Sequence, residues 1–148
     1  MKRPTVISKV LSPNDVGETG GHQAGFLIPK SNGALWFFPQ LSDSVKNPRC
    51  ELYFEDEVCH NWKLSFIYYN NKYYGGTRDE YRLTGLTKYF RQNGLESGDT
   101  ITLSRNDDEE YQIRYSRSSP SNIVVQTGAD GTSIKKLIVS DAWRVIEY

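Results

Sequence analysis

Two polar stretches of the chain carry side chains of the kinds that hydrogen-bond to a partner in a fixed geometry. In the first, NDVGETGGHQAGFLIP, the residues Asn14, Asp15, His22 and Gln23 lie among four glycines. Glycine has no Cβ, so this backbone can approach a ligand closely, and Asn, Gln and His side chains can hydrogen-bond to the edges of bases. The simpler interpretation is a polar, glycine-rich loop that only connects two strands.

The second stretch, YYGGTRDEYR, places charged residues of both signs directly after two glycines. If it is extended, its side chains alternate between two faces, so Arg78, Glu80 and Arg82 share one side while Asp79 and Tyr81 share the other. Arginine can bind guanine through two hydrogen bonds in the major groove, and a carboxylate can accept from the amino group of cytosine. The alternative is a surface strand whose charges neutralise one another, and such pairs stabilise a fold little.

The spacing of residues gives weaker support to a zinc site, a nucleotide-binding loop or a nucleophilic active site. Structural zinc requires ligands paired roughly two to four residues apart, twice over. Cys59 and His60 are adjacent and have no matching pair, and we expect Cys50 and Cys59 to be half-buried strand residues. The GETGGH segment lacks the lysine and the spacing of a phosphate-binding loop, and no Gly-x-Ser-x-Gly nucleophile motif is present.

A metal-dependent nuclease is the other catalytic alternative. It would need clustered carboxylates beside a lysine, because carboxylates hold a hard cation and a cationic group assists the reaction. Glu55, Asp56, Glu57 and Lys63 could supply that set. The acidic run follows directly on a strand-like segment, however, which is more typical of a solvated sheet edge.

Composition limits the classes of protein to which the chain can belong. Its 148 residues suit one domain, and two cysteines do not form a disulfide framework. The formal net charge is zero, yet eight acidic residues fall in two short runs at 51–57 and 107–110, which leaves 18 basic residues against 10 acidic ones elsewhere. A polyanion could bind there if the acidic runs lie on other faces. We expect a soluble, cytoplasmic protein with no membrane partner, since no apolar stretch approaches the ~18 residues of a membrane span.

The elements that must position these residues are mainly strands. Seven short segments are rich in β-branched or aromatic residues and are bounded by Gly, Asn, Asp or Pro, which predicts a barrel or a sandwich. They are 5–11, 24–29, 50–56, 62–70, 99–105, 110–116 and 122–127. The segment YYNNKYY predicts a hairpin that turns at Asn70 and Asn71 and carries tyrosines on both strands. The last segment, WRVIEY, is also strand-like.

Two further segments are compatible with short helices. The apolar segment 32–41 is a helix or turn that Pro39 should end. The segment 84–94 has apolar residues at helical spacing, and Gly94 stands where a C-terminal cap is expected.

Three longer motifs resemble one known family. LSPNDVGETGGHQAGFLIP (11–29) is similar to the start of the N-terminal domain of EcoRII-type restriction endonucleases, and IYYNNKYYGGTRDEYRLT (67–84) is similar to a second signature of that family. LIVSDAWRV (137–145) matches its closing segment, and LESGDTITL (95–103) resembles a turn of the plant B3 transcription-factor domains, which share the fold. The resemblance implies a single domain that folds as an open seven-stranded β pseudobarrel with two short helices.

The resemblance also implies a function. The family's domain holds duplex DNA in a cleft, with an N-terminal and a C-terminal arm entering the major groove at a site like CC(A/T)GG. It serves as the effector and target-recognition part of a type II restriction endonuclease whose cutting is done by a separate nuclease domain. We therefore expect double-stranded DNA as the partner, no catalytic residues and no cofactor in this domain, Mg²⁺ only in a linked nuclease domain, and a monomeric isolated domain.

Residue roles follow from the two polar stretches together with the family motifs. Base-reading roles are predicted for His22, Gln23, Asn14, Asp15, Arg78, Asp79, Glu80 and Arg82. Contacts to the DNA backbone are predicted for Lys9, Ser12, Thr19, Gly20, Gly21, Lys72, Thr77, Lys88 and Arg91. The alternatives that stay open are the small metal-dependent nuclease and a β-barrel that stacks single-stranded DNA or RNA on its aromatic residues, which make up 13% of the chain.

Overall fold

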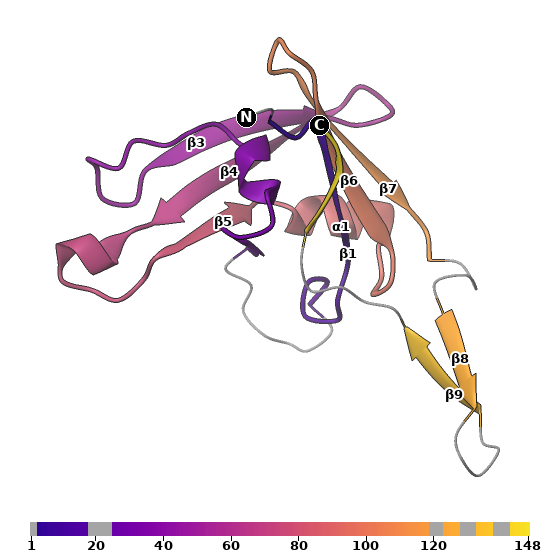
Figure 1. Ribbon diagram of the computed structural model, residues 1–148. Helices are drawn as coiled ribbons and strands as arrows, with labels where there is room; N and C mark the ends of the chain where they lie inside the picture. Colours follow the sequence, from indigo (N-terminus) through magenta and orange to yellow (C-terminus); the bar gives the residue numbers. More distant parts are fainter. Residues whose placement is uncertain (1–2, 18–24, 119–122, 128–132, 138–142) are drawn as a thin grey trace.

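The chain forms one curled eight-stranded sheet and a separate two-stranded hairpin (Figure 1). The computed structural model describes residues 3–17, 25–118, 123–127, 133–137 and 143–148, apart from the side chains of 123–127 and 133–137. The order of the large sheet is β10-β1-β6-β7-β3-β4-β5-β2. Its strands are β1 (Val6–Val10), β2 (Phe26–Ile28), β3 (Arg49–Glu55), β4 (Asn61–Tyr69), β5 (Glu80–Thr84), β6 (Thr100–Arg105), β7 (Tyr111–Ser116) and β10 (Arg144–Glu147). The hairpin pairs β8 (Ile123–Thr127) with β9 (Ser133–Leu137).

Neighbouring strands of the large sheet are antiparallel except at one junction. There, β3 and β7 run parallel and pair only at Phe54–Tyr111 and Glu55–Gln112. The long strand β4 pairs with β3 on one side and with β5 on the other. The short strand β2 adds to the free side of β5, with Ile28 opposite Tyr81. Because this pairing is antiparallel, the segment that follows β2 lies beside the segment that precedes β5.

Three short helices complete the described fold. The 3-10 turns are η1 (Ala34–Phe37) and η2 (Asn71–Tyr74), and the one α-helix is α1 (Thr87–Asn93). The helix ends at Gly94, whose left-handed backbone (φ 60°) lets its N–H bond back to the helix. Both predicted helical segments are therefore confirmed, the first as a 3-10 turn that ends before Pro39. No helix among the described residues is long and apolar enough to cross a membrane.

Aromatic side chains on the inner face of the sheet form much of the core. Every second residue of β4 from Trp62 to Phe66 is buried, as expected for a strand with one face on a core. Phe66 stacks on Phe38, with ring centroids 4.4 Å apart. Tyr89 of α1 packs edge-on against Trp62 at 5.3 Å, which holds the helix against the sheet.

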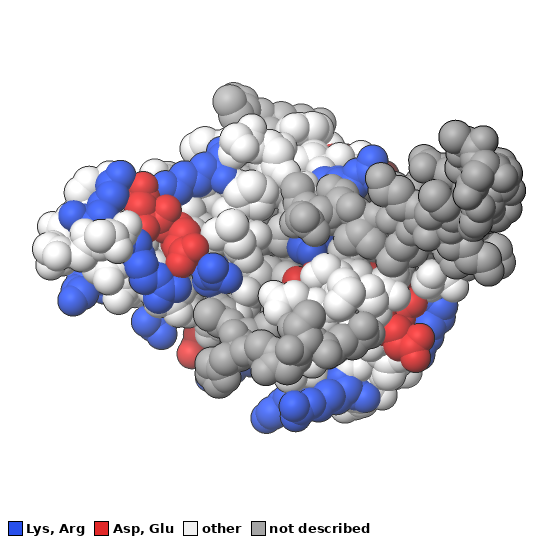
Figure 2. All heavy atoms as spheres, turned by 90° about the horizontal axis from the view of Figure 1, so that it is seen from below, with Lys and Arg blue, Asp and Glu red and all other residues white. Residues whose placement is uncertain are grey.

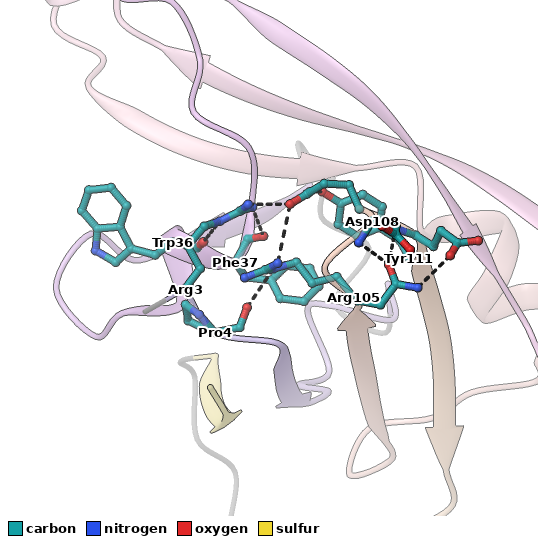
Figure 3. Close-up of polar contacts among 10 residues, drawn as sticks. Arg3, Pro4, Trp36, Phe37, Arg105, Asp108 and Tyr111 are labelled. Atoms are coloured by element: carbon teal, nitrogen blue, oxygen red, sulfur yellow. Dashed lines mark hydrogen bonds and ion pairs between the residues drawn. The ribbon is translucent and has the colours of Figure 1, made fainter. Parts of the chain in front are cut away.

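Polar contacts tie together the end of the sheet where both chain termini lie (Figures 1 and 3). Arg3 donates from Nε and Nη2 to the carbonyls of Trp36 and Phe37, in both cases at 3.0 Å. The same guanidinium contacts Glu109 on the β6–β7 turn at 2.5 Å, and Arg105 lies 3.5 Å from that carboxylate. The segment before β1, the η1 turn and the β6–β7 turn are thereby held as one unit, at the opposite end from the β8–β9 hairpin.

The predicted fold class, an open β pseudobarrel with short helices, is confirmed. All seven predicted strands are present, but 122–127 lies in the β8–β9 hairpin and not in the large sheet. The large sheet gains β5 and β10 in its place and so has eight strands. The sequence of β5, EYRLT, is mostly polar, and it is a strand because β4 and β2 pair with its two sides.

The predicted hairpin turn at Asn70 and Asn71 is wrong. Ten residues that contain η2 join β4 to β5. The Asn70 side chain is buried and hydrogen-bonds to the backbone of the 45–47 loop, and its φ is −114° instead of a left-handed value. The left-handed position falls at Gly75 (φ 90°), after η2. The tyrosines at 73 and 74 are therefore exposed on η2 and do not lie on a strand.

Candidate nucleic-acid interface

The connection between β4 and β5, together with the start of β5 (residues 70–82), is here called the C-arm. Within it the structure brings together three of the predicted base-reading residues. Glu80 accepts at Oε1 from Arg78 Nε (3.0 Å) and Nη2 (2.8 Å), and at Oε2 from Arg82 Nη2 (3.2 Å). Burial alone would raise the pKa of Glu80, but the two guanidinium groups hold it below its usual range. Glu80 is therefore a carboxylate at neutral pH and lines up both arginines.

The two arginines of this cluster differ in what they can offer to a ligand. The Arg78 guanidinium lies 3.9 Å from the centroid of the Tyr69 ring and its side chain is 41% exposed. Arg82 is 23% exposed, and its Nη1 donates to the carbonyl of Gly25 at 3.0 Å. Its Nε is buried and has no hydrogen-bond partner among the described residues. Arg78 therefore presents its guanidinium outward, whereas Arg82 joins the C-arm to the segment that enters β2.

Asp79 points away from this cluster, as the strand alternation predicts. Its Oδ1 accepts from the buried Tyr68 hydroxyl at 2.5 Å and lies 2.7 Å from Lys30 Nζ, and its Oδ2 accepts from Lys72 Nζ at 2.8 Å. The two lysines and the phenol hold the pKa of Asp79 well below its usual range. The hydrogen bond to Asp79, together with burial, raises the pKa of Tyr68. Asp79 is thus the centre of a second polar cluster at the base of the C-arm.

The segment between β1 and β2 (residues 11–25) is here called the N-arm, and only 11–17 and Gly25 fall within the described residues. Lys9 is buried and its Nζ lies 2.5 Å from Asp15 Oδ2. The same Asp15 oxygen accepts from the Ser12 N–H at 2.9 Å, and the Asp15 N–H donates to Ser12 Oγ at 3.2 Å. These contacts make Lys9, Ser12 and Asp15 the base that fixes where the N-arm leaves the sheet. The remaining predicted N-arm residues lie outside the described part of the chain: Thr19, Gly20, Gly21, His22 and Gln23.

The two arms border one hollow in the surface. It has a volume of about 280 Å³ and is lined by Lys9, Ser12, Asn14, Asp15, Gly25, Phe26, Leu27 and Arg82. The lining includes residues of both polar stretches that the sequence singles out. The structure therefore places the base of the N-arm directly beside the C-arm.

Charge is distributed unevenly over the surface. Lys30, Lys72, Arg78 and Arg82 surround Asp79 and Glu80, and Figure 2 shows basic atoms around acidic ones on the side of the C-arm. The two acidic runs instead converge on another hollow of about 390 Å³, whose lining includes Glu51, Glu55, Glu109 and Glu110. The local excess of positive charge at the C-arm is therefore compatible with a net charge of zero.

The other predicted contacts to the DNA backbone are exposed. Lys72 and Thr77 lie on the C-arm, and Lys88 and Arg91 lie on the outer face of α1. Sequence reasoning missed Lys30, which contacts Asp79 across the β2–β5 pair. The available signal was the register of the β2–β5 pair, in which Ile28 lies opposite Tyr81. Because the strands are antiparallel, the residue two positions after Ile28, Lys30, falls opposite the residue two positions before Tyr81, Asp79. It could be used only once the pairing of β2 with β5 was known.

Of the residues considered for metal chemistry, Asp56 has a structural role, and the two cysteines lie in different environments. Asp56, predicted to lie on a solvated edge, is instead buried and accepts from Trp62 Nε1 at 2.9 Å and from backbone N–H groups of the β3–β4 turn. Cys50 is a half-buried strand residue as predicted, but Cys59 is exposed in that turn with a left-handed φ of 63°. Among the described residues, no three of the His, Cys, Asp and Glu side chains are grouped so as to hold a metal ion.

Comparison with known proteins places these features in a family. The family model described as "Restriction endonuclease EcoRII, N-terminal" matches residues 2–113. The type II restriction enzyme EcoRII of Escherichia coli is 39% identical over 145 residues, which covers 91% of this chain and 35% of that enzyme. A B3 domain-containing protein of Oryza sativa subsp. japonica is 30% identical over 115 residues, or 77% of this chain and 34% of that protein. The chain thus spans about a third of the length of these curated relatives.

A solved structure confirms the fold. The structure named "Arabidopsis FUS3-DNA complex" superposes with a TM-score of 0.57 at 23% sequence identity, and the match covers 76% of this chain and 96% of that one. Both the sequence relatives and this structure agree with the resemblance inferred from the motifs at 11–29 and 67–84. The chain belongs to the family of EcoRII restriction endonuclease N-terminal domains.

Proposed function

We propose that this domain binds double-stranded DNA at a specific sequence, with the C-arm and the N-arm entering the major groove. The observation that carries the proposal is the Arg78–Glu80–Arg82 cluster, which lies beside the hollow bordered by the base of the N-arm. Arginine and carboxylate groups on one face match the donors and acceptors of a G·C pair. The family supports the proposal, because its relative EcoRII is a type II restriction enzyme.

Within this proposal the arm residues have distinct roles. Arg78 binds guanine, because its side chain is the more exposed of the two and its guanidinium is supported by the Tyr69 ring. Glu80 aligns the arginines and accepts from cytosine, and Arg82 chiefly joins the two arms through Gly25. On the N-arm, His22, Gln23 and Asn14 contribute further contacts to base edges.

The contacts change the roles predicted for three residues, Lys9, Asp15 and Asp79. Lys9 is buried against Asp15, so we propose that this pair positions the N-arm and reaches neither phosphate nor base. Asp79 is held by Tyr68 and two lysines, so we propose that it does not read a base. Contacts to phosphate are then proposed for the exposed residues Lys72, Thr77, Lys88 and Arg91, and for Ser12, Thr19, Gly20 and Gly21 of the N-arm.

We further propose that the domain is the target-recognition part of a larger restriction endonuclease. Cleavage and its Mg²⁺ requirement would then belong to a separate nuclease domain, and this domain would bind a site like CC(A/T)GG as a monomer. Incubation of plasmid DNA with the domain and Mg²⁺ tests the first part, because cleavage that Glu57→Ala abolishes would show that the domain is itself a nuclease.

The experiment that tests DNA recognition is selection from a randomised duplex pool, followed by sequencing of the retained DNA. Arg78→Ala should then lower the ratio of specific to random affinity by about 5- to 140-fold, the value of one bidentate base contact. Lys88→Ala should weaken binding to all sequences alike and reduce the salt slope by about 0.9, the value of one phosphate contact. If Arg78→Ala leaves the ratio unchanged, the base-reading role is wrong, and preference for single strands would refute the duplex model.

A further inference from the structure

Lys46 and Arg49 are two exposed cations beside the C-arm. Lys46 lies in the 45–47 loop, and Arg49 is the first residue of β3. Neither side chain has a hydrogen-bond, ion-pair or cation–π partner among the residues that the structure describes. The four cations at the C-arm differ, because Asp79 and Glu80 bind all of them. Lys46 and Arg49 can therefore bind an anion without first breaking an ion pair.

Hydrogen bonds fix the 45–47 loop to the start of the C-arm. The buried Asn70 accepts at Oδ1 from the Asn47 N–H at 2.7 Å, and the Asn70 N–H donates to Asn47 Oδ1 at 3.3 Å. Asn70 Nδ2 also donates to the Val45 carbonyl at 2.8 Å. The backbone on both sides of Lys46 is thus held in a fixed position relative to the C-arm.

The strand register places Arg49 on the same face of the sheet as the arginine cluster. Arg49 lies opposite Ile67 of β4, and Ile67 lies opposite Arg82 of β5. Directly opposed residues of neighbouring strands point to the same face. This is the face away from the core, because the preceding residue of β4, Phe66, belongs to the core cluster. Arg49 therefore faces outward together with Arg82 and, two residues away on β5, Glu80.

The spacing of the strands matches the dimensions of duplex DNA. Neighbouring strands lie about 4.8 Å apart, so the backbone of Arg49 is about 10 Å from that of Arg82. The major groove is about 12 Å wide, and a sugar–phosphate backbone borders each side of it. With β5 facing the groove, the start of β3 faces one of these backbones. The next carboxylate along β3, Glu51, is paired with Lys63 at 3.2 Å, which reduces its repulsion of an anion.

We propose that Lys46 and Arg49 bind phosphates of the duplex, so that the DNA-binding surface extends from β5 across β4 to the start of β3. The inference rests on the proposed function, since it adds a contact surface for the same duplex. Contacts to phosphate fix register and orientation but carry no direct sequence information. Lys46 and Arg49 therefore add affinity for every duplex, whereas Arg78 discriminates between sequences.

The salt dependence of binding gives the expected size of the effect. Each phosphate contact adds about 0.9 to the slope of log affinity against log salt concentration. Between about 50 and about 200 mM salt, one contact therefore accounts for a loss of about 3.5-fold in affinity. Arg49→Ala and Lys46→Ala should each reduce the slope by about 0.9, and the double variant by about 1.8. The ratio of specific to random affinity should not change.

The test measures binding by fluorescence anisotropy across a salt series. The probes are the duplex recovered from the selection and a scrambled duplex of the same composition. Arg49→Lys keeps the positive charge and should retain the slope. Lys63→Ala is the matched control, because it removes an exposed cation from the same face, about 13 Å along β4 from Ile67, where Glu51 already pairs with it. Urea unfolding confirms that every variant is folded.

A second measurement locates the contact on the DNA. Single phosphates of the selected duplex are replaced, one at a time, by uncharged methylphosphonates. At the position that Arg49 contacts, the wild-type protein should lose affinity, whereas Arg49→Ala should lose none.

A wild-type slope in either single variant, or a reduction no larger than that of Lys63→Ala, would overturn the inference. A loss confined to the selected duplex would also overturn it, because that result indicates a base contact. Methylphosphonate effects that Arg49→Ala leaves unchanged at every position would do the same. A wild-type protein with no preference for any duplex would instead refute the proposed function, so the two failures are distinguishable.

Discussion

Replacing Glu80 with glutamine should separate recognition from stability. The carboxylate accepts three hydrogen bonds from Arg78 and Arg82, at 3.0, 2.8 and 3.2 Å. Glutamine has the same shape but only one oxygen, so its amide NH₂ must face either a guanidinium donor or the amino group of cytosine. Both arrangements place a donor against a donor, and neither arginine pair keeps its charge attraction.

The structure predicts a small loss of stability and a large loss of binding specificity for Glu80→Gln. Glu80 is 26% exposed, and partly exposed ion pairs contribute about 0.2–1 kcal/mol each, so the free energy of unfolding should fall by no more than about 2 kcal/mol. Loss of a good base contact should lower the ratio of specific to random affinity by about 5- to 140-fold. Removing a negative charge also favours any polyanion, but this tightens binding to both duplexes alike and leaves their ratio unchanged.

Competition titration with the selected and the scrambled duplex measures the ratio, and urea unfolding measures stability. Glu57→Gln is the matched control, because it makes the same change at an exposed position in the β3–β4 turn. An unchanged ratio would refute the recognition role of Glu80. A loss of stability above about 3 kcal/mol with proportionate loss of binding to both duplexes would show that Glu80 acts only on folding.

Two further predictions concern the scaffold that holds the arms. Gly25→Ala should destabilise the fold by about 1–3 kcal/mol in urea unfolding, because Gly25 has a φ of 89° and a Cβ there would lie 2.5 Å from the Leu83 carbonyl oxygen. Gly17→Ala, with a similar φ but no atom of the described residues within 4 Å of the added Cβ, should cost less, and equal losses would contradict the steric argument. Burial alone would raise the pKa of Asp56, but hydrogen bonds from Trp62 and from backbone N–H groups hold it below its usual value, so its contribution is present above about pH 4 and lost as pH falls through the folded-state pKa. Asp56→Asn should therefore be less stable than wild type at pH 7, with a difference that shrinks below about pH 4; a constant difference would contradict this assignment.

The elements that were predictable are those decided by local pattern. The helix 84–94 combines apolar residues at helical spacing with a glycine at its end, and α1 has both. The seven predicted strands have β-branched or aromatic residues between turn residues, and all are present. β5 was not on that list, because only two of its residues, Tyr81 and Thr84, are aromatic or β-branched, and its neighbours in the sheet decide its conformation.

The tight turn predicted at Asn70 is wrong for a related reason, although β4 and β5 do pair as antiparallel neighbours. Asparagine favours a tight turn when its side chain is free to bond locally. Here that side chain is buried and bonded to the 45–47 loop, which is more than twenty residues away in sequence. The local preference of Asn70 is therefore outweighed by a tertiary contact that the sequence does not display.

In the candidate site, too, local pattern predicts some features and strand pairing decides the others. Alternation along an extended segment is a local rule, and it correctly grouped Arg78 with Glu80 and placed Asp79 on the other side. The partners of Asp79 and the burial of Lys9 depend on which strands pair, so they required the structure.

Internal pairing also explains how a chain with zero net charge can have a DNA-binding surface in the proposed scheme. Each of the four cations at the C-arm contacts Asp79 or Glu80 in the free protein, so the surface carries its charge without leaving it unpaired. Both carboxylates are held ionised by these same contacts, since the pKa of each lies below its usual range. A duplex must then offer a better acceptor than a carboxylate already in place. In the proposed scheme, guanine and phosphate together supply such acceptors where the arms fit the groove.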